Sequence, residues 1–401
     1  MNMKMAALFL ALPLLAIDWP QWRGVERNGI SPETGLAKSW PAAGPPLVWK
    51  ARGLGAGYAA FSVASGVLYT QGQRGGREFV LAIDVKNGQK VWETPTGAAF
   101  EESRGDGPRG TPTLDGERLY AMAADGTLAC LETRTGKKIW TVDLMKRFET
   151  QANYWGMSES PLLDGDRLIV TPGGRGASVV ALNKMNGETI WKSQNDEAGY
   201  SSAIAFDLGG IRQIAVLTGE AALGLDIKNG ALLWRYNKVS NQTANVATPI
   251  FHDGHVFVST DYGTGGALLK LTPQGGTVKA TEVYFNQEMK NHYSTSVLVG
   301  DYLYGFSSSI LTAMKFQTGQ VAWRDRSVGK GSVTYADGKL YLFGETGVVG
   351  LAEATPTAYK EISRFQIQSG EYPTWTPPVI SDGKMYLREQ DNLYCYDIKA
   401  R

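Results

Sequence analysis

The chain has 401 residues, of which 48 are glycines, about 12% against a usual value near 7%. Its 40 lysines and arginines balance 39 aspartates and glutamates, which leaves a formal net charge of +1. This balance argues against a nucleic-acid partner, because surfaces that bind nucleic acid are strongly basic. A glycine-rich chain in which 10% of the residues are aromatic instead favours many tight turns between short strands.

The first predicted element is a signal peptide at residues 1–16. Lys4 provides a basic start, and residues 6–16 form an apolar stretch that is too short to span a bilayer as a helix. An uncleaved interfacial anchor is the alternative for this stretch. No cysteine follows it, so lipidation is not predicted, and we expect no transmembrane segment elsewhere. The pattern is typical of a bacterial protein that is periplasmic or secreted.

A repeated block dominates the rest of the chain, in forms such as LAIDVKNGQKVW and ACLETRTGKKIW. Each copy places an Asp-like residue eight positions before a tryptophan, with an Asn-Gly or Thr-Gly pair between them. The glycine supplies the positive φ of a hairpin turn, and the tryptophan ring can cover the space between two sheets. Copies end at Trp92, Trp140, Trp191, Trp234 and Trp323. Phe285 and Phe365 lie near the corresponding places in a fifth and a seventh unit.

A second turn signal counts the same units independently. It occurs at Ser65-Gly66, Asp115-Gly116, Asp164-Gly165, Gly209-Gly210, Asp253-Gly254, Gly300-Asp301, Asp337-Gly338 and Asp382-Gly383. Eight units, each of about 40–50 residues, match four-stranded antiparallel blades. The last unit lacks its fourth strand, and the segment PPLVWK around Trp49 can supply it. We therefore predict an all-β, eight-bladed β-propeller over residues 45–401, closed by its N-terminal strand, after an N-terminal extension at residues 17–44.

The two cysteines fit this repeat without a disulfide. Cys130 and Cys395 occupy a small-residue position two before the Asp-like residue. Other units have Ala82, Ala181, Gly224, Ala313 and Gly350 there, and only Lys270 departs from the rule. Equivalent positions in different blades lie too far apart to be bridged. We expect two free, buried thiols.

The repeat resembles the pyrroloquinoline quinone (PQQ) repeat of quinoprotein alcohol dehydrogenases and of the outer-membrane-protein assembly factor BamB. The opening DWPQWRGVERNGISPETGLAKSWP is similar to exported bacterial proteins usually called PQQ-binding-like β-propeller repeat proteins. This resemblance implies the fold, but it does not imply that a quinone binds. The chain also lacks the adjacent-cysteine disulfide common in the dehydrogenases and the Cys-x-x-Cys-His of haem-bearing relatives.

Candidate site residues lie in the loops that join the last strand of one blade to the first strand of the next. In propellers these loops meet at one mouth of the channel. They include Arg104, Asp106, Arg109, Tyr154, Trp155, Glu159, Tyr200, Asn245, Lys290, Asn291, His292, Lys330 and Trp375. This inventory could bind a polar aromatic anion, although polar residues in loops can also serve only to meet solvent.

Specific roles follow from side-chain chemistry. Arg109, Lys290 or Lys330 could pair with carboxylates, and Trp155 or Trp375 could stack on a flat ring. Glu159 and Asn245 are the candidate Ca²⁺ ligands, because that ion prefers oxygen donors. No catalytic residue is assigned.

Three functions remain open at this stage. The favoured one is an exported, non-catalytic propeller, expected to be a monomer, that binds or scaffolds a protein or small-molecule partner without a cofactor. The alternative is a PQQ- and Ca²⁺-dependent alcohol or sugar dehydrogenase. A sugar-binding protein that uses exposed tryptophan and tyrosine is the third.

Overall fold

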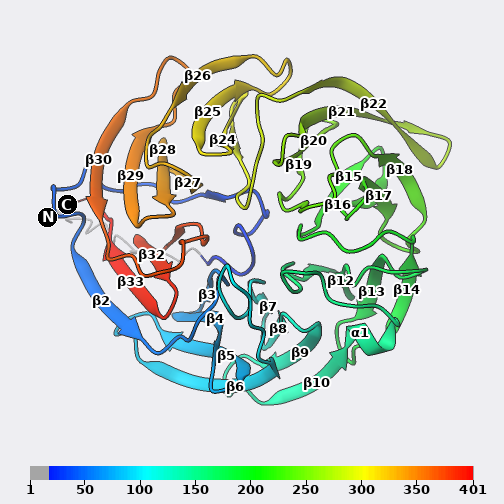
Figure 1. The fold of residues 1–401 in the computed structure, drawn as a ribbon, viewed down its shortest axis with the longest axis horizontal. Helices are drawn as coiled ribbons and strands as arrows, with labels where there is room; N and C mark the ends of the chain where they lie inside the picture. Colours follow the sequence, from blue (N-terminus) through cyan, green and yellow to red (C-terminus); the bar gives the residue numbers. More distant parts are fainter. Residues whose placement is uncertain (1–17, 401) are drawn as a thin grey trace, which may run out of the picture.

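The structure is a computed structural model that describes residues 18–400, so the predicted signal peptide lies outside the described residues. These residues form eight sheets around a common axis (Figure 1). Seven sheets have four strands, and one has a fifth because β1 (Ile30–Ser31) is added to it in parallel. The predicted eight-bladed propeller of antiparallel four-stranded blades is confirmed.

In each blade the four main strands pair in chain order from the axis outward, except that the outermost strand of blade 8 comes from the N-terminal part of the chain (Figure 1). Blades 1 and 2 consist of β3 (Ser62–Ala64), β4 (Val67–Arg74), β5 (Arg77–Asp84), β6 (Lys90–Ala98), β7 (Thr113–Asp115), β8 (Arg118–Met122), β9 (Thr127–Glu132) and β10 (Lys138–Asp143). Blades 3 and 4 consist of β11 (Leu162–Asp164), β12 (Arg167–Val170), β13 (Val179–Asn183), β14 (Thr189–Ser193), β15 (Ile204–Leu208), β16 (Ile211–Leu217), β17 (Ala222–Asp226) and β18 (Leu232–Tyr236).

The second half of the ring repeats this pattern. Blades 5 and 6 consist of β19 (Ile250–His252), β20 (His255–Thr260), β21 (Gly265–Gln274), β22 (Thr277–Asn286), β23 (Val297–Val299), β24 (Tyr302–Ser307), β25 (Ile310–Lys315) and β26 (Val321–Asp325). Blades 7 and 8 consist of β27 (Gly331–Ala336), β28 (Lys339–Gly344), β29 (Val348–Glu353), β30 (Glu361–Gln366), β31 (Val379–Ser381), β32 (Lys384–Glu389), β33 (Asn392–Asp397) and β2 (Leu47–Arg52).

The ring closes between the two ends of the chain. The N-terminal strand β2 pairs antiparallel with β33, so that Trp49 lies opposite Cys395. This pairing removes the open sheet edges that an unclosed ring would have. The only helix in residues 18–400 is α1 (Leu144–Arg147), and no helix in this part of the chain is long and apolar enough to cross a bilayer.

The repeated tryptophans and glycines make one contact between neighbouring blades. The indole N–H of Trp92 donates to Thr133 O of the next blade at 2.8 Å. The Trp92 ring lies against Gly136 of the same turn, where a Cβ would come within 2.5 Å of the ring. Trp49, Trp140, Trp191 and Trp323 donate in the same way to Val85, Lys184, Ile227 and Thr355. In four of these turns a glycine is needed both for its positive φ, about 70°, and for the ring that covers it, and only the turn at Thr355 has no glycine.

Blade 5 departs from the sequence prediction. Its hairpin from β21 to β22 is longer, and the register places Ala267, not Lys270, opposite Phe285. Tyr284, not Phe285, makes the contact between blades, because its hydroxyl donates to Phe316 O at 2.9 Å. The long β21–β22 hairpin of blade 5 offers no short turn to Trp234 of blade 4. The indole N–H of Trp234 donates instead to Gln213 of its own blade.

The thiols are free and buried, as predicted. Cys130 lies opposite Trp140 in the same register that places Cys395 opposite Trp49. Both side chains belong to apolar clusters between blades, and their burial raises the pKa of each thiol. A small side chain is required here because a tryptophan faces it across the strand pair.

Candidate functional site

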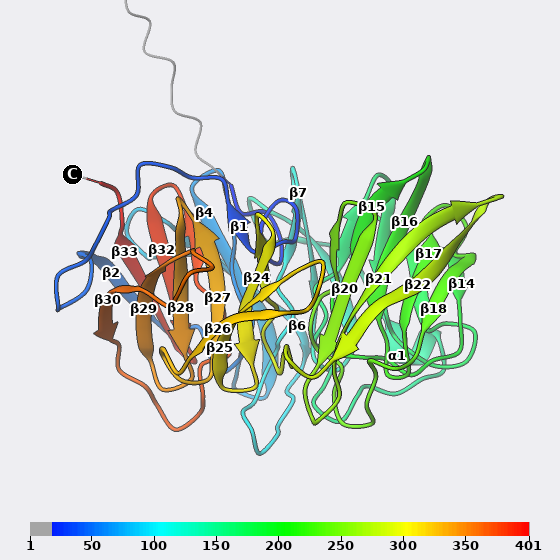
Figure 2. The ribbon, with the colours of Figure 1, turned by 90° about the horizontal axis from the view of Figure 1, so that it is seen from above.

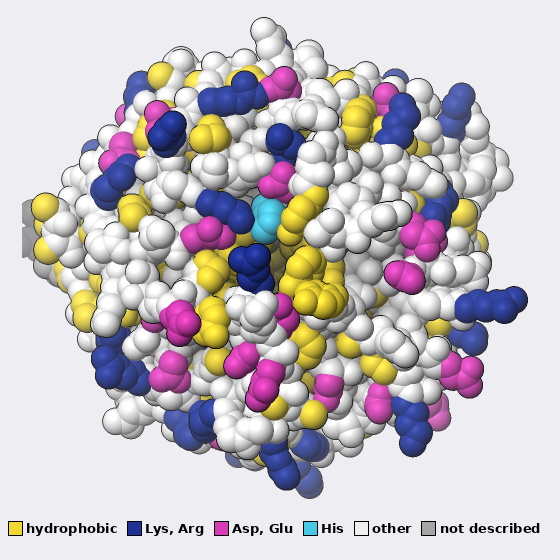
Figure 3. Space-filling view, viewed as in Figure 1, with side chains coloured by type: hydrophobic (Ala, Val, Ile, Leu, Met, Phe, Trp, Pro, Cys, Tyr) yellow, Lys and Arg dark blue, Asp and Glu magenta, His cyan; other side chains and the backbone are white. Residues whose placement is uncertain are grey.

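A cavity of about 710 Å³ lies on the axis of the ring, and we call it the mouth pocket. Figure 3 shows this hollow at the centre of one face, with lysine, arginine and histidine side chains at its edge. Its volume is within the range of sites for small molecules, about 300–1,000 Å³. The lining comprises Trp22, Tyr58, Ser103, Arg104, Arg109, Trp155, Ser158, Ser160, Tyr200, Ser202, Thr243, Ala244, Val246, Thr248, Tyr262, His292, Tyr293, Lys330, Glu345, Glu371, Tyr372, Pro373 and Trp375.

Most of these residues come from the loops between the outer strand of one blade and the inner strand of the next. Arg104 and Arg109 lie between β6 and β7, and Trp155 lies between α1 and β11. Seven predicted residues are brought together here, namely Arg104, Arg109, Trp155, Tyr200, His292, Lys330 and Trp375. Their role as ligand contacts stays a prediction.

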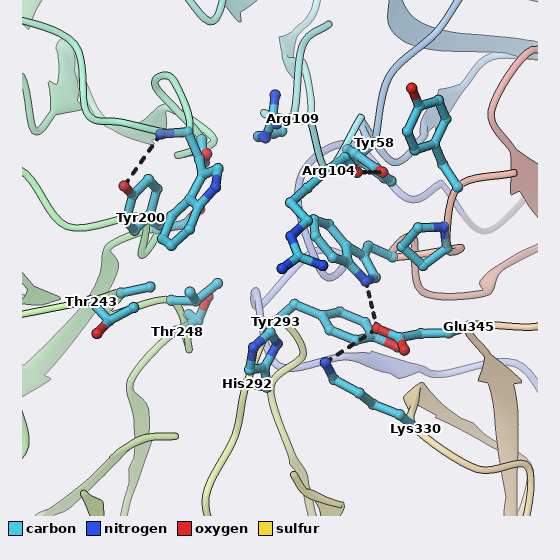
Figure 4. Close-up of a pocket in the computed structure, with 18 of the residues that line it drawn as sticks. Tyr58, Arg104, Arg109, Tyr200, Thr243, Thr248, His292, Tyr293, Lys330 and Glu345 are labelled. Atoms are coloured by element: carbon cyan, nitrogen blue, oxygen red, sulfur yellow. Dashed lines mark hydrogen bonds and ion pairs between the residues drawn. The ribbon is translucent and has the colours of Figure 1, made fainter. Parts of the chain in front are cut away.

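One wall of the pocket is a stack of aromatic rings. The ring of Trp375 stacks against Tyr58 with centroids 4.7 Å apart, and against Tyr293 with centroids 5.6 Å apart. Its indole N–H donates to Glu345 Oε1 at 2.7 Å (Figure 4). Two stacked neighbours leave Trp375 little free ring face, so this wall is a rigid surface that Trp375 organises.

The facing wall carries Tyr200 (Figure 4) and, in contact with it, Trp155. The Trp155 ring meets Tyr154 edge-on and Tyr200 at a tilt of 51°. Neither neighbour stacks on it, and no other described residue has a recorded ring contact with it. Trp155 therefore has a ring face without a stacked neighbour that can receive a flat group.

Three cationic side chains line the pocket, and they differ in the partners that each one has. Arg109 donates to Gly107 O at 2.6 Å and to Gly105 O at 2.9 Å, so it holds its own loop. Lys330 pairs with Glu345 at 3.3 Å and lies over the Tyr293 ring (Figure 4). The guanidinium of Arg104 makes no hydrogen bond or ion pair within residues 18–400 and is exposed. Arg104 is thus the cation most available to an incoming anion.

Two buried polar atoms in the wall have no partner among the described residues. They are the hydroxyl of Tyr293 and Nδ1 of His292. Burial raises the pKa of Tyr293 well above its usual value, and burial together with Lys330 lowers the pKa of His292. At neutral pH both side chains are therefore uncharged. Buried polar atoms in native proteins nearly always have a partner, so these two atoms are suited to a hydrogen-bonding ligand.

The other predicted residues support the loops instead of lining the pocket. Asp106 accepts from Glu102 N at 2.9 Å, and the buried Asn291 bonds to Ser259 and to Phe306 O. The backbone of Lys290 bonds to Ser307 and Ser308, and its side chain is not in the lining. The Tyr154 side chain is 76% exposed and also lies outside the lining.

The candidate Ca²⁺ ligands are occupied by the protein itself. Both oxygens of Glu159 accept hydrogen bonds from Thr171, and Asn245 Oδ1 accepts from Asn241 N. Burial raises the pKa of Glu159 to about 7, against the opposing effect of the Thr171 hydrogen bonds. Within residues 18–400 no group of three or more His, Cys, Asp and Glu residues could hold a metal ion. These donors do not fit a Ca²⁺ site at the mouth pocket.

Comparison with known families shows to which family the repeat belongs. The family described as outer membrane protein assembly factor BamB matches residues 76–325. The chain belongs to this family of PQQ-repeat propellers. The outer membrane protein assembly factor BamB of Yersinia pestis is 24% identical over 268 residues, and that of Shewanella oneidensis is 22% identical over 263 residues. The two matches cover 63% and 61% of this chain and 65% of each relative, so the chain matches less than two thirds of these relatives' length.

Solved structures show the same fold at low identity. BamB from Moraxella catarrhalis is 15% identical, with a TM-score of 0.63, and the match covers 88% of this chain and all of that one. Quinohemoprotein alcohol dehydrogenase from Comamonas testosteroni is 12% identical, with a TM-score of 0.66, and the match covers 96% of this chain and 81% of the other. An assembly factor and an alcohol dehydrogenase therefore resemble this chain about equally in fold, so the fold does not choose between the two functions.

Several residues that line the pocket were not predicted from the sequence. Trp22, Tyr58, Tyr262, Glu345 and Tyr372 line the pocket without having been predicted. Trp22 comes from the N-terminal extension, far from any inter-blade loop in the sequence. The run DWPQWRG was a usable signal, because two tryptophans and an arginine outside the repeats need a place to be buried.

Proposed function

We propose that the protein is an exported, non-catalytic binding propeller whose mouth pocket takes a ligand with an anionic group and a flat apolar face. The observation that carries this proposal is the pairing of two available groups in one pocket. Arg104 offers a guanidinium without a carboxylate partner, and Trp155 offers a ring without a stacked neighbour. Such a pair suits an anion attached to an aromatic or apolar body.

Membership of a family described as an outer membrane protein assembly factor supports a binding role and a periplasmic or secreted location. The predicted signal peptide points the same way. The ligand can be a small molecule or the exposed end of a partner protein. The partner of this chain is left open, because the matched relatives are only partly covered by it.

A quinone dehydrogenase is the less supported alternative. Its chemistry would need Ca²⁺ beside the quinone, and the predicted donors Glu159 and Asn245 do not fit that ion. The pocket carboxylate Glu345 is engaged by Lys330 and Trp375. These contacts leave it poorly placed to act as a free general base.

The binding test uses 8-anilinonaphthalene-1-sulfonate (ANS), a fluorescent aromatic anion. We expect saturable binding at one site, weakened about tenfold or more in Arg104→Ala and in Trp155→Ala. Arg134→Ala is the matched control, because Arg134 is an exposed arginine in a turn of the outer rim. Wild-type protein that shows no saturable binding, or two pocket variants that bind like the control, would remove the mouth pocket as the site.

The catalytic alternative is tested on the same protein. PQQ is added with and without Ca²⁺, and dye reduction is followed with a panel of alcohols and sugars. Quinone binding without turnover supports the non-catalytic proposal, and PQQ- and Ca²⁺-dependent turnover overturns it.

A further inference from the structure

The N-terminal segment at residues 19–31, which we call the plug, crosses the axis of the propeller. Figure 1 shows it running through the centre of the ring, and Figure 2 shows β1 toward one face of the disc. Backbone bonds join Trp19 to Val63 of blade 1, Pro20 to Leu114 of blade 2, and Gly29 to Tyr335 of blade 7. The plug therefore connects blades 1 and 2 with blade 7, which lies three positions from blade 2 around the ring.

The plug enters from the face opposite the mouth pocket. Asp18 bonds to Ser65 and Glu33 bonds to Gly383, and both partners lie in turns between the first and second strands of a blade. These turns project from the opposite face to the loops that line the mouth pocket, since the inner strand of each blade runs from one face to the other. The middle of the plug reaches back toward the pocket along this axis.

Two arginines anchor the middle of the plug. Arg23 donates to Thr295 O at 3.0 Å and to Ser296 O at 2.7 Å, beside the inner strand of blade 6. Arg27 donates to Ser160 O at 2.8 Å, beside the inner strand of blade 3. Their side chains are 4% and 3% exposed. Both residues have positive φ, 62° and 52°, a conformation that non-glycine residues rarely adopt and that persists only where the surroundings impose it.

Trp22, the residue before the first anchor, forms the floor of the mouth pocket. Its indole N–H donates to Thr248 Oγ1 at 3.0 Å, and its ring is part of the pocket lining. The space beneath it, between the plug and Trp375, holds only about 10 Å³. That is close to the smallest cavity that can contain one water molecule. The plug therefore makes the mouth pocket blind at its inner end.

The anchors also bring charge to this closed end. Burial lowers the pKa of Arg23 and of Arg27 to about 9, so both remain protonated at neutral pH. Their hydrogen-bond partners are carbonyl oxygens and one amide oxygen, which carry no net charge. The buried carboxyl near Arg27 is Glu159, whose pKa of about 7 makes it a partial counter-charge only. Charges held in a low-dielectric wall act over longer distances than charges in water.

We propose that the plug is the specificity element of the mouth pocket: Trp22 closes its inner end, and Arg23 and Arg27 make that end selective for anions. This inference rests on the proposed binding function and adds a source of selectivity that lies outside the repeats. It assigns to the plug the choice between charged and neutral ligands, whereas Arg104 and Trp155 provide direct contacts at the rim.

The test compares two probes with the same ring system. ANS carries a sulfonate, and N-phenyl-1-naphthylamine is its neutral counterpart, so the ratio of their affinities measures anion selectivity. In Arg27→Gln we expect ANS affinity to fall about threefold to tenfold while affinity for the neutral probe changes less than twofold. Arg27→Lys keeps the charge and should retain most of the selectivity. In Trp22→Ala both probes should bind more weakly, because the floor is lost.

The outcomes separate this inference from the proposed function. If ANS binds the wild type and the rim variants weaken it, but Arg27→Gln leaves the affinity ratio unchanged, the plug inference is overturned alone. If the wild type binds neither probe at the pocket, the proposed function fails first. Thermal melts check that each variant is folded. Should Arg27→Gln not fold, Arg23→Gln with Arg23→Lys provides the same charge comparison, and an unchanged ratio there also overturns the inference.

Discussion

On the outer rim five blades repeat one contact, whereas at the axis no two loops present the same residues to the mouth pocket. The rim contact joins a tryptophan of one blade to a glycine turn of the next, as in Trp92 with Gly136. At the axis the partners are irregular, as in Arg104, Trp155 and the plug residue Trp22. The repeats thus build a stable ring, and the departures from the repeat give it a site.

This difference predicts that rim substitutions reduce stability and that pocket substitutions reduce binding. The largest effect on stability is expected for Trp191→Ala. Trp191 is 8% exposed and donates to Ile227 O of the next blade at 3.0 Å. Its removal should lower the free energy of unfolding by about 3–5 kcal/mol, measured by denaturant titration. Ile190→Ala is the control, because Ile190 is 43% exposed and should change stability by about 0.5 kcal/mol or less. Equal effects in the two variants would contradict the rim contact.

A smaller loss of stability is expected for Gly230→Ala. Gly230 has a φ of 74°, which disfavours alanine by about 1–2 kcal/mol, and a Cβ would lie 2.5 Å from the Trp191 ring. Gly210 has a φ of 78° with nothing within 4 Å of a Cβ, so Gly210→Ala should show the backbone effect alone. Denaturant midpoints of the two variants check the comparison. A midpoint for Gly230→Ala no lower than that of Gly210→Ala would mean that the ring does not need the glycine.

The smallest of these effects is the pH dependence of stability that Glu159, a buried carboxyl, should cause. Burial raises the pKa of Glu159 from its ordinary 4.5 to about 7. Folding therefore favours the protonated carboxyl, and its contribution to stability is full below pH 4.5 and is lost as the pH rises through 7. Relative to Glu159→Gln, the wild type should gain thermal stability between pH 7.5 and pH 5.5. Parallel melting curves for the two proteins over this interval would contradict the raised pKa.

The structure of the outer rim could be predicted from the sequence in detail, because its contacts repeat along the chain. The eight turns, the small residue two positions before each Asp-like residue and the closure of the ring by β2 were all predicted from spacing. The prediction was wrong in blade 5, where a longer hairpin shifts the register and puts Ala267 at the place assigned to Lys270. A single unit with an altered hairpin length cannot be corrected from the pattern of the others.

Only some of the pocket residues could be predicted from the sequence. Their position in the loops correctly predicted Arg104 and Trp155 as pocket residues. It also predicted Glu159 and Asn245, whose side-chain oxygens accept hydrogen bonds from the protein itself. Whether a loop side chain faces the axis or bonds to its own backbone depends on contacts with neighbouring loops, which spacing does not encode.

By itself, the sequence determined the number of blades, their strand order and the buried state of both thiols, because each of these follows from local spacing repeated along the chain. Only the tertiary structure decided that residues 19–31 cross the axis and close the mouth pocket. The reason is physical: the partners that fix Trp22, Arg23 and Arg27 to the ring lie more than a hundred residues away in sequence, beside the inner strands of three different blades. They come together only when the ring has closed.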